Sequence, residues 1–307
     1  MRFSLLRVRT LGGVVATGLL ACMAFATPAH ALGPAHGQFP HLTHLSANTN
    51  TSNNWFGYNQ GTLEQSGRQF HSITGDWTVP TATQHTANQA EDSSNWIGIG
   101  GGCVDANCAV GDNTLIQTGT DQAVDSAGHA SYSTWWEVIP GPSVDFGLTI
   151  GPGDHMRASV SEVVPNSEVW DITLTDVTRN ETATMSVPYS SSYATAEWIE
   201  ETPLSLDPTT GVGLTALPNV TNPNFDLGTV NGSGSALKAS EEIALTDANN
   251  KVIGTPSAPD ADTDGFGACA WATSCGAPAS SAPVRAHAPK SRAHARSRRN
   301  ARRSGRR

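Results

Sequence analysis

The chain lacks the sequence motifs of the common hydrolase classes. It contains no Gly-x-Ser-x-Gly, the turn that carries the nucleophile of many serine hydrolases, and no His-Glu-x-x-His, the zinc site of many metallopeptidases. It contains no Asp-Thr-Gly or Asp-Ser-Gly either, which argues against a pepsin-like pair of aspartates. The four histidines between residues 53 and 276 stand apart from one another, and we interpret each as a surface residue rather than a base: His71, His85, His129 and His155.

Long apolar runs are also scarce. The run Leu11–Ala26 is too short to span a membrane and follows a start that contains three arginines, and no later stretch is apolar enough to span. Ala29-His30-Ala31 then fits a signal-peptidase site. These features predict a signal peptide over residues 1–31 and a secreted protein that begins near Leu32.

Basic residues are nearly absent from the body of the chain. Residues 32–276 hold five of them against 27 acidic residues, a formal charge of −22: Arg68, Arg157, Arg179, Lys238 and Lys251. Such a body repels itself at neutral pH, and the repulsion fades as carboxylates protonate near a pKa of about 4. The acidity can serve solubility alone, but the scarcity of lysine favours a fold suited to work in acid.

Cysteine is sparse and locally paired. Cys22 lies in the signal, and the other four fall into two pairs, Cys103 with Cys108 and Cys269 with Cys275. Four cysteines allow three connectivities, and an oxidising compartment favours the two local disulfides. A zinc site is the weaker alternative, because neither pair has Cys-x-x-Cys spacing and no histidine is near in the sequence.

Composition divides the chain into four parts. Residues 1–31 are the signal, and residues 32–52 are a polar, flexible leader or a very short pro-segment. Residues 53–276 form the folded domain, and residues 277–307 form a tail rich in Ala, Pro, Ser and Arg that cannot bury a core. We expect the whole to be a monomer.

The tail carries ten basic residues and no acidic one. A solvated cationic run of this kind can bind an anionic cell surface. It has no interleaved aromatic residues for base stacking, so specific nucleic-acid binding is not expected.

The domain is expected to be all-β. Short runs rich in Thr, Val, Ile and Trp alternate in polarity and end at Gly, Pro, Asn or Asp, and no segment of a dozen residues has a helical period. About a dozen strands with hardly any helix predict a β-sandwich. The expected strands are Ile73–Val79, Ser94–Ile99, Thr114–Thr118, Ser131–Val138, Val144–Ile150, His155–Val163, Trp170–Thr175, Glu181–Val187, Ala196–Glu200 and Ala236–Leu245.

Two of these strands carry polar groups suited to hydrolysis. Gln117 lies in Leu-Ile-Gln-Thr-Gly and Glu197 in Ala-Glu-Trp-Ile, each among apolar or aromatic neighbours. A carboxylate can take a proton from water while an amide N–H stabilises the oxyanion of a tetrahedral intermediate. Together the two residues predict a hydrolase of amide bonds that uses neither metal nor cofactor.

Four blocks in order resemble the eqolisins, the glutamic peptidases. They are Asn95-Trp-Ile-Gly-Ile-Gly100, Leu115-Ile-Gln-Thr-Gly-Thr-Asp121, Tyr132-Ser-Thr-Trp-Trp-Glu137 and Ala196-Glu-Trp-Ile-Glu-Glu201, and Gly75-Asp-Trp-Thr-Val-Pro80 is similar to the family's entry strand. The resemblance covers most of residues 53–271. It implies a concanavalin-like or jelly-roll-like sandwich of two antiparallel sheets with the active cleft on a concave face. It also implies protein or peptide substrates and an acid-acting endopeptidase without a covalent intermediate.

The resemblance assigns roles to individual residues. Glu197 would be the general base, and Gln117 would hold the water and polarise the carbonyl oxygen. Trp96 and Trp135 match aromatic residues that line the cleft, although sandwiches also bury Trp between their sheets. The two acidic residues Asp121 and Glu137 match groups that orient the pair, although both could lie at an exposed strand edge.

Glu200 and Glu201 compete with Glu197 for the role of the base. Side chains alternate along a strand, so Glu197 and Glu201 share a face while Trp198 and Glu200 point the other way. The family motif selects the glutamate before the tryptophan, which is Glu197, although the pattern alone leaves Glu201 possible.

Two features depart from the family pattern. Fungal members usually carry Asp where this chain has Gly100, and residues 101–113, with their cysteine pair, are an unusual insertion. Both precede Gln117 closely and would reshape the substrate pocket.

One further motif is similar to half of a calcium loop. Asp260-Ala-Asp-Thr-Asp-Gly265 matches the first half of an EF-hand loop, but its twelfth position is Trp271 rather than Glu and no helix is expected beside it. We therefore expect an Asp/Gly turn here rather than a metal site.

Two functions of other classes remain open at this point. A lectin-like sandwich could be a glycoside hydrolase that uses Glu137 and Glu197 as paired carboxylates. It could also be a non-catalytic carbohydrate-binding module, which would hydrolyse no protein at any pH.

Overall fold

The computed structural model describes residues 41–45, 50–207 and 211–279. Within these residues it contains twenty strands and one 3-10 helix, η1 (Ala239–Glu241), which confirms the expected all-β class. No helix in this part of the chain has the length and apolar character that crossing a membrane would need. The predicted signal and residues 280–307 of the tail lie outside the described residues.

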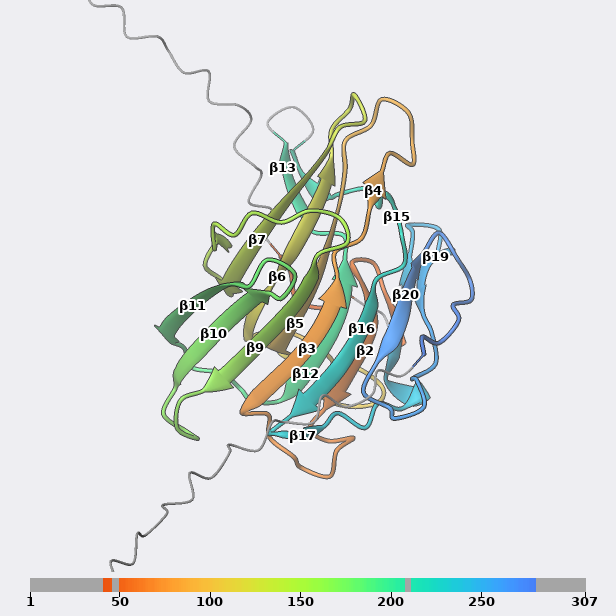
Figure 1. Ribbon diagram of the computed structural model, residues 1–307. Helices are drawn as coiled ribbons and strands as arrows, with labels where there is room; N and C mark the ends of the chain where they lie inside the picture. Colours follow the sequence, from red (N-terminus) through yellow and green to blue (C-terminus); the bar gives the residue numbers. More distant parts are fainter. Residues whose placement is uncertain (1–40, 46–49, 208–210, 280–307) are drawn as a thin grey trace, which may run out of the picture. The chain divides into compact units, whose positions relative to one another are not determined.

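Most strands belong to two antiparallel sheets, shown one behind the other in Figure 1. The five-strand sheet has the order β11 (Glu181–Pro188), β10 (Val169–Asp176), β9 (His155–Glu162), β3 (Ser72–Thr78) and β16 (Asn224–Val230). The seven-strand sheet has the order β18 (Glu242–Thr246), β2 (Trp55–Gly61), β12 (Thr195–Glu201), β5 (Glu91–Gly100), β6 (Leu115–Val124), β7 (Ala130–Val138) and β8 (Val144–Asp145).

Two further strands join the sheets. β20 (Phe266–Ala270) pairs with β16, and β19 (Val252–Pro256) pairs with both β20 and β18, so one hydrogen-bonded path connects the sandwich. The short strands are β1 (Thr51–Ser52), β4 (Ala82–Thr83), β13 (Leu204–Asp207), β14 (Gly211–Leu214), β15 (Asn219–Val220) and β17 (Ser233–Gly234).

The main core lies between the two sheets. Ile97, Ile99 and Trp198 of the seven-strand sheet belong to one buried cluster with Ile172 and Met156 of the five-strand sheet. The seven-strand sheet has a second buried cluster, formed by residues that alternate with those of the main core: Trp55, Trp96, Leu115, Trp135, Ile199 and Ile243. Because side chains alternate across a strand, this second cluster lies on the other face of the sheet.

Most of the expected strands are confirmed, but two are wrong in extent. Of Val144–Ile150 only the first two residues are strand, and within Ala236–Leu245 the long strand begins at Glu242 after η1. The expected strands also omit β2, β16, β19 and β20, and β2 shows no regular alternation of polar and apolar residues. Both predicted disulfides are confirmed, Cys103–Cys108 and Cys269–Cys275.

Candidate active site

A row of aligned residues crosses the middle of the seven-strand sheet. Glu137 pairs with Gln117, Gln117 with Gly98, Gly98 with Glu197, and Glu197 with Asn59. Residues directly opposite each other on antiparallel strands project from the same face. Gln117 and Glu197 therefore share one face, that of the Trp96 cluster, as the resemblance implied.

Gly98 lies between the two candidate catalytic residues. Two interstrand spacings place the backbones of Gln117 and Glu197 about 10 Å apart. A Cβ on Gly98 would lie 3.1 Å from Gln117 Cβ and 3.0 Å from Trp96. Neighbouring side chains therefore pack closely over Gly98, and a larger residue between the two candidate catalytic groups would crowd them.

The amide of Gln117 is oriented by Glu137. Gln117 Nε2 donates a hydrogen bond of 2.9 Å to Glu137 Oε2, and both side chains are fully buried. Burial raises the pKa of Glu137 to about 7, against the opposing charge of His41, and the nearby Glu201 adds a smaller rise. Because Glu137 accepts one amide hydrogen, the second N–H of Gln117 can serve another acceptor.

Glu197 lies under the loop that follows β5. Its side chain is fully buried, neither carboxyl oxygen has a hydrogen-bond partner among the described residues, and burial raises its pKa well above the usual range. A Cβ on Gly102 would lie only 2.7 Å from Glu197 Oε1, and Asn59 Nδ2 donates to Cys103 O at 2.9 Å. The predicted insertion thus packs directly over the candidate base.

Trp96 and Trp135 belong to this face and not to the core between the sheets. Glu201 lies four residues further along β12, opposite Ser94, and its Oε2 accepts a hydrogen bond of 2.8 Å from Trp96 Nε1. Asp121 accepts a hydrogen bond from the Ser94 hydroxyl, and burial raises the pKa of its carboxyl to about 6. Asp121 and Glu137 are both buried, so neither lies at an exposed strand edge.

The leader supplies a residue that the sequence analysis missed. His41 is buried on this face, where it stacks on Trp135 at 3.8 Å between ring centroids and Nδ1 lies 2.9 Å from Glu201 Oε2. Burial alone would lower the pKa of His41, but the carboxylates of Glu201, Glu137 and Asp121 raise it to about 9. His41 stands alone in a polar segment without periodicity, so the sequence did not predict that it would lie in the candidate site.

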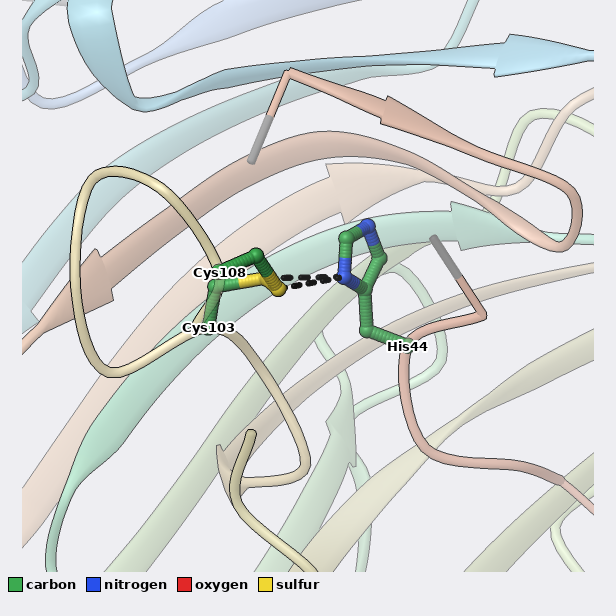
Figure 2. A group of neighbouring side chains, drawn as sticks. All are labelled: His44, Cys103 and Cys108. Carbon is green, nitrogen blue, oxygen red and sulfur yellow. Dashed lines mark hydrogen bonds between the residues drawn. A yellow bond between two sulfur atoms is a disulfide. The ribbon is translucent and has the colours of Figure 1, made fainter. Parts of the chain in front are cut away.

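His44 continues the leader across the face. Its backbone N–H donates to Gly101 O at 2.9 Å, and Nδ1 lies 3.1 Å from Cys103 Sγ (Figure 2). A histidine therefore does lie beside this cysteine pair in space, contrary to the sequence-based expectation. The two cysteines are joined in a disulfide and are not thiolate ligands, so zinc binding here is not supported.

Glu200 and Trp198 lie on the opposite face of β12, as the strand alternation predicted. Trp198 packs in the main core and donates through Nε1 to Thr74 O at 2.8 Å. Glu200 is buried next to Asn95, and burial raises its pKa to about 8. The opposite face thus separates Glu200 from Glu197, and the sheet register separates Glu201, which lies in the row of Ser94 and Asp121 rather than that of Gln117.

Comparison with known proteins decides the family. Residues 53–263, more than two thirds of the chain, match the sequence profile of the Peptidase A4 family. The chain belongs to this family of eqolisins. It is accordingly a glutamic-type peptidase, and its substrates are peptides. No curated protein matches the chain.

Solved structures support the fold of this eqolisin. A crystal structure of scytalido-glutamic peptidase with a transition state analog inhibitor has a TM-score of 0.54 at 20% identity, covering 71% of this chain and 98% of that one. A second structure of that peptidase, with a peptide based transition state analog, has a TM-score of 0.51 at the same identity and coverage. These likenesses show a shared β-sandwich fold.

Proposed function

We propose that this eqolisin is a secreted endopeptidase that works in acid, with Glu197 as general base and Gln117 as oxyanion donor. One observation carries the assignment of the pair: Gln117 and Glu197 lie in a single register row on one sheet face, with Gly98 between them. A water held between the two groups would be within reach of both a proton acceptor and an amide donor.

The proposed steps follow from the residues in the row. Glu197 takes a proton from the water as the water attacks the peptide carbonyl. The N–H of Gln117 that Glu137 leaves free stabilises the oxyanion. Glu197 then gives its proton to the leaving amine. Glutamine does not titrate, so its donor persists at acid pH.

Catalysis requires the face to open to solvent. Burial raises the pKa of Glu197, so in the arrangement described here the carboxyl group is neutral in acid and cannot act as a base. Exposure to water removes this penalty and returns the pKa toward about 4.3. Because His41 and His44 cross the same face, the leader would compete with a substrate for it.

Further features of the chain support secretion, activity in acid and retention at a cell surface. The signal-like residues 1–31 and the two disulfides support secretion. The charge of −22 over residues 32–276 supports work in acid, where self-repulsion is least. The cationic residues of 277–307 would hold the monomeric enzyme at an anionic cell surface, and deleting them should release it at low salt.

The test is digestion of a denatured protein at pH 3–4 in the presence of an aspartic-peptidase inhibitor. We expect Glu197→Gln and Gln117→Ala each to lower kcat by at least about 10²–10³, because one removes the base and the other an oxyanion donor. Glu200→Gln is the matched control. Its carboxyl, with a pKa of about 8, is already neutral at this pH, so the amide should preserve activity.

Retention of half of the wild-type rate by either Glu197→Gln or Gln117→Ala would refute the assignment. The glycoside hydrolase considered from the sequence gains no support, since Glu137 and Glu197 lie three strand spacings, about 14 Å, apart along the sheet.

A further inference from the structure

A cluster of carboxylates lies at the junction of the two sheets, on elements that the proposed active site does not use. Asp260 and Asp264 belong to the loop between β19 and β20, and Asp226 lies on β16, which pairs with β20. One carboxylate oxygen from each of these three residues lies within 4.8 Å of the other two. Asp262 adds a fourth charge nearby, since it raises the pKa of both loop aspartates.

Hydrogen bonds within the β19–β20 loop engage only one of the two carboxylate oxygens of Asp260. Asp260 Oδ1 accepts the backbone N–H groups of Asp264 and Gly265, each at 3.3 Å, which leaves Oδ2 outside this turn. Oδ2 is buried, the residue is only 5% exposed, and Oδ2 has no hydrogen-bond partner among the described residues. Asp264 Oδ1 is likewise buried and unpartnered. A buried carboxylate oxygen without a partner is costly unless a cation satisfies it.

Protein cations do not neutralise the cluster. Among the described residues, the ion pairs of Arg157, Arg179 and Lys238 all go to other acids, Arg68 donates to a backbone carbonyl, and Lys251 lies beside Asp247.

Gly265 brings the loop against β16. A Cβ at this position would lie 2.6 Å from Phe225 O and 2.9 Å from Asp260 Oδ2, so only glycine permits the close approach. The approach places the loop beside Asp226. In the sequence analysis the motif Asp260–Gly265 lacked the closing acid of an EF-hand loop. Asp226, on a strand more than thirty residues earlier, supplies an additional carboxylate beside the loop.

We propose that Asp226, Asp260 and Asp264 bind a calcium ion that fastens the β19–β20 loop to β16. Calcium accepts carboxylate and carbonyl oxygens in irregular geometry, whereas magnesium requires a near-octahedral site at shorter distances. Asp226 and Asp264 are partly exposed, so the ion can exchange with solvent. With three or four carboxylates in a secreted protein, we expect a Kd of about 10⁻⁴–10⁻³ M.

Calorimetric titration of the full chain with CaCl₂ at pH 7 tests the site, together with thermal unfolding in 10 mM CaCl₂, 10 mM MgCl₂ or EDTA. We expect saturable binding of one calcium ion and a rise in Tm of about 4 °C with calcium that magnesium does not reproduce. The proposed peptidase works in acid, so measurements of calcium binding at neutral pH do not depend on its activity. Binding should weaken at pH 4, because protons compete for the ligands.

Asp260→Asn is the diagnostic variant. Its amide oxygen can still accept the two loop N–H groups, so the loop should fold, but the charged ligand is lost and calcium affinity should fall at least ten-fold. Asp247→Asn is the matched control, because Asp247 Oδ1 caps a similar turn at Asn249 and Lys251 outside the cluster. Absence of calcium binding, equal stabilisation by magnesium, or unchanged affinity in Asp260→Asn would each overturn the proposal.

Discussion

Gly100 determines how the backbone leaves β5 and enters the loop over the candidate active site. Its φ is +99°, in the region that favours glycine, and a Cβ there would lie 2.1 Å from Thr114 O. Fungal eqolisins usually carry Asp at the matching position, but this backbone leaves no room for a side chain. The glycine lets the chain leave β5 and turn over Asn59 and Glu197.

An aspartate at position 100 should therefore destabilise this protein. We expect Gly100→Asp to lower the free energy of unfolding by about 2–4 kcal/mol, since it adds both a disfavoured φ and a backbone clash. Urea unfolding at pH 5 measures the change. Gly111→Asp in the same loop has open space around its Cβ and an ordinary φ, so it should shift the unfolding midpoint little. Equal stability of the two variants would contradict this account.

At the scale of elements, the leader and the β5–β6 loop meet over the same face. His41 lies against Trp135, and its charge is held by Glu201, Glu137 and Asp121. The stabilisation from this attraction is full below about pH 6.5 and is lost as the pH rises through about 9, where the imidazole loses its proton. It also weakens as the pH falls through about 7 and 6, where Glu137 and Asp121 become neutral. The leader is therefore held most firmly near pH 6.5–7 and less firmly both in acid and toward pH 9.

Removing the imidazole should free the face for a substrate. We expect His41→Ala to raise the initial rate of peptide cleavage several-fold at pH 5–6 and less at pH 3, where the leader is already loosened. Initial rates on chains verified by mass to be intact give the comparison. His129→Ala, an exposed histidine paired with Asp125, should change nothing. A lower rate in His41→Ala would mean that the imidazole assists the chemistry instead of blocking it.

At the scale of the molecule, buried acids with raised pKa values should make stability fall as pH rises. Their carboxyls bind protons more tightly in the folded chain than in the unfolded one, with pKa values of about 6, 7 and 8 for Asp121, Glu137 and Glu200. A raised carboxyl pKa costs nothing below the unfolded value of about 4.3 and destabilises increasingly as pH rises toward the folded value. His41 acts in the same direction, since the stability it adds below about pH 6.5 is lost through about pH 9.

We therefore expect Tm to be highest near pH 4–5 and to decline steadily toward pH 9, with the body charge of −22 adding to the decline. Calorimetry in EDTA, across a pH series at constant ionic strength, provides the measurement. The Glu200→Gln variant should show a shallower decline, because it removes one of the acids that must ionise in the core. A Tm that rises between pH 5 and 8 would be inconsistent with these pKa shifts.

The strand pattern, the cysteine spacing and the family blocks were enough to predict the all-β class, the local disulfides and the shared face of Gln117 and Glu197. Strand periodicity fixes which side chains point the same way, and cysteines five or six residues apart need no long-range information to pair. β2 escaped prediction because it shows no regular alternation of polar and apolar residues.

The linear sequence of this protein by itself determined its family, its strand alternation and the chemistry that its side chains offer. Only the tertiary structure decided which distant groups meet. In the folded chain His41 stacks on Trp135, the β5–β6 loop packs over Glu197, and Asp226 lies beside Asp260 and Asp264. The reason is that such contacts depend on sheet register and loop closure between segments far apart in the chain, and no local pattern of polar and apolar residues records them.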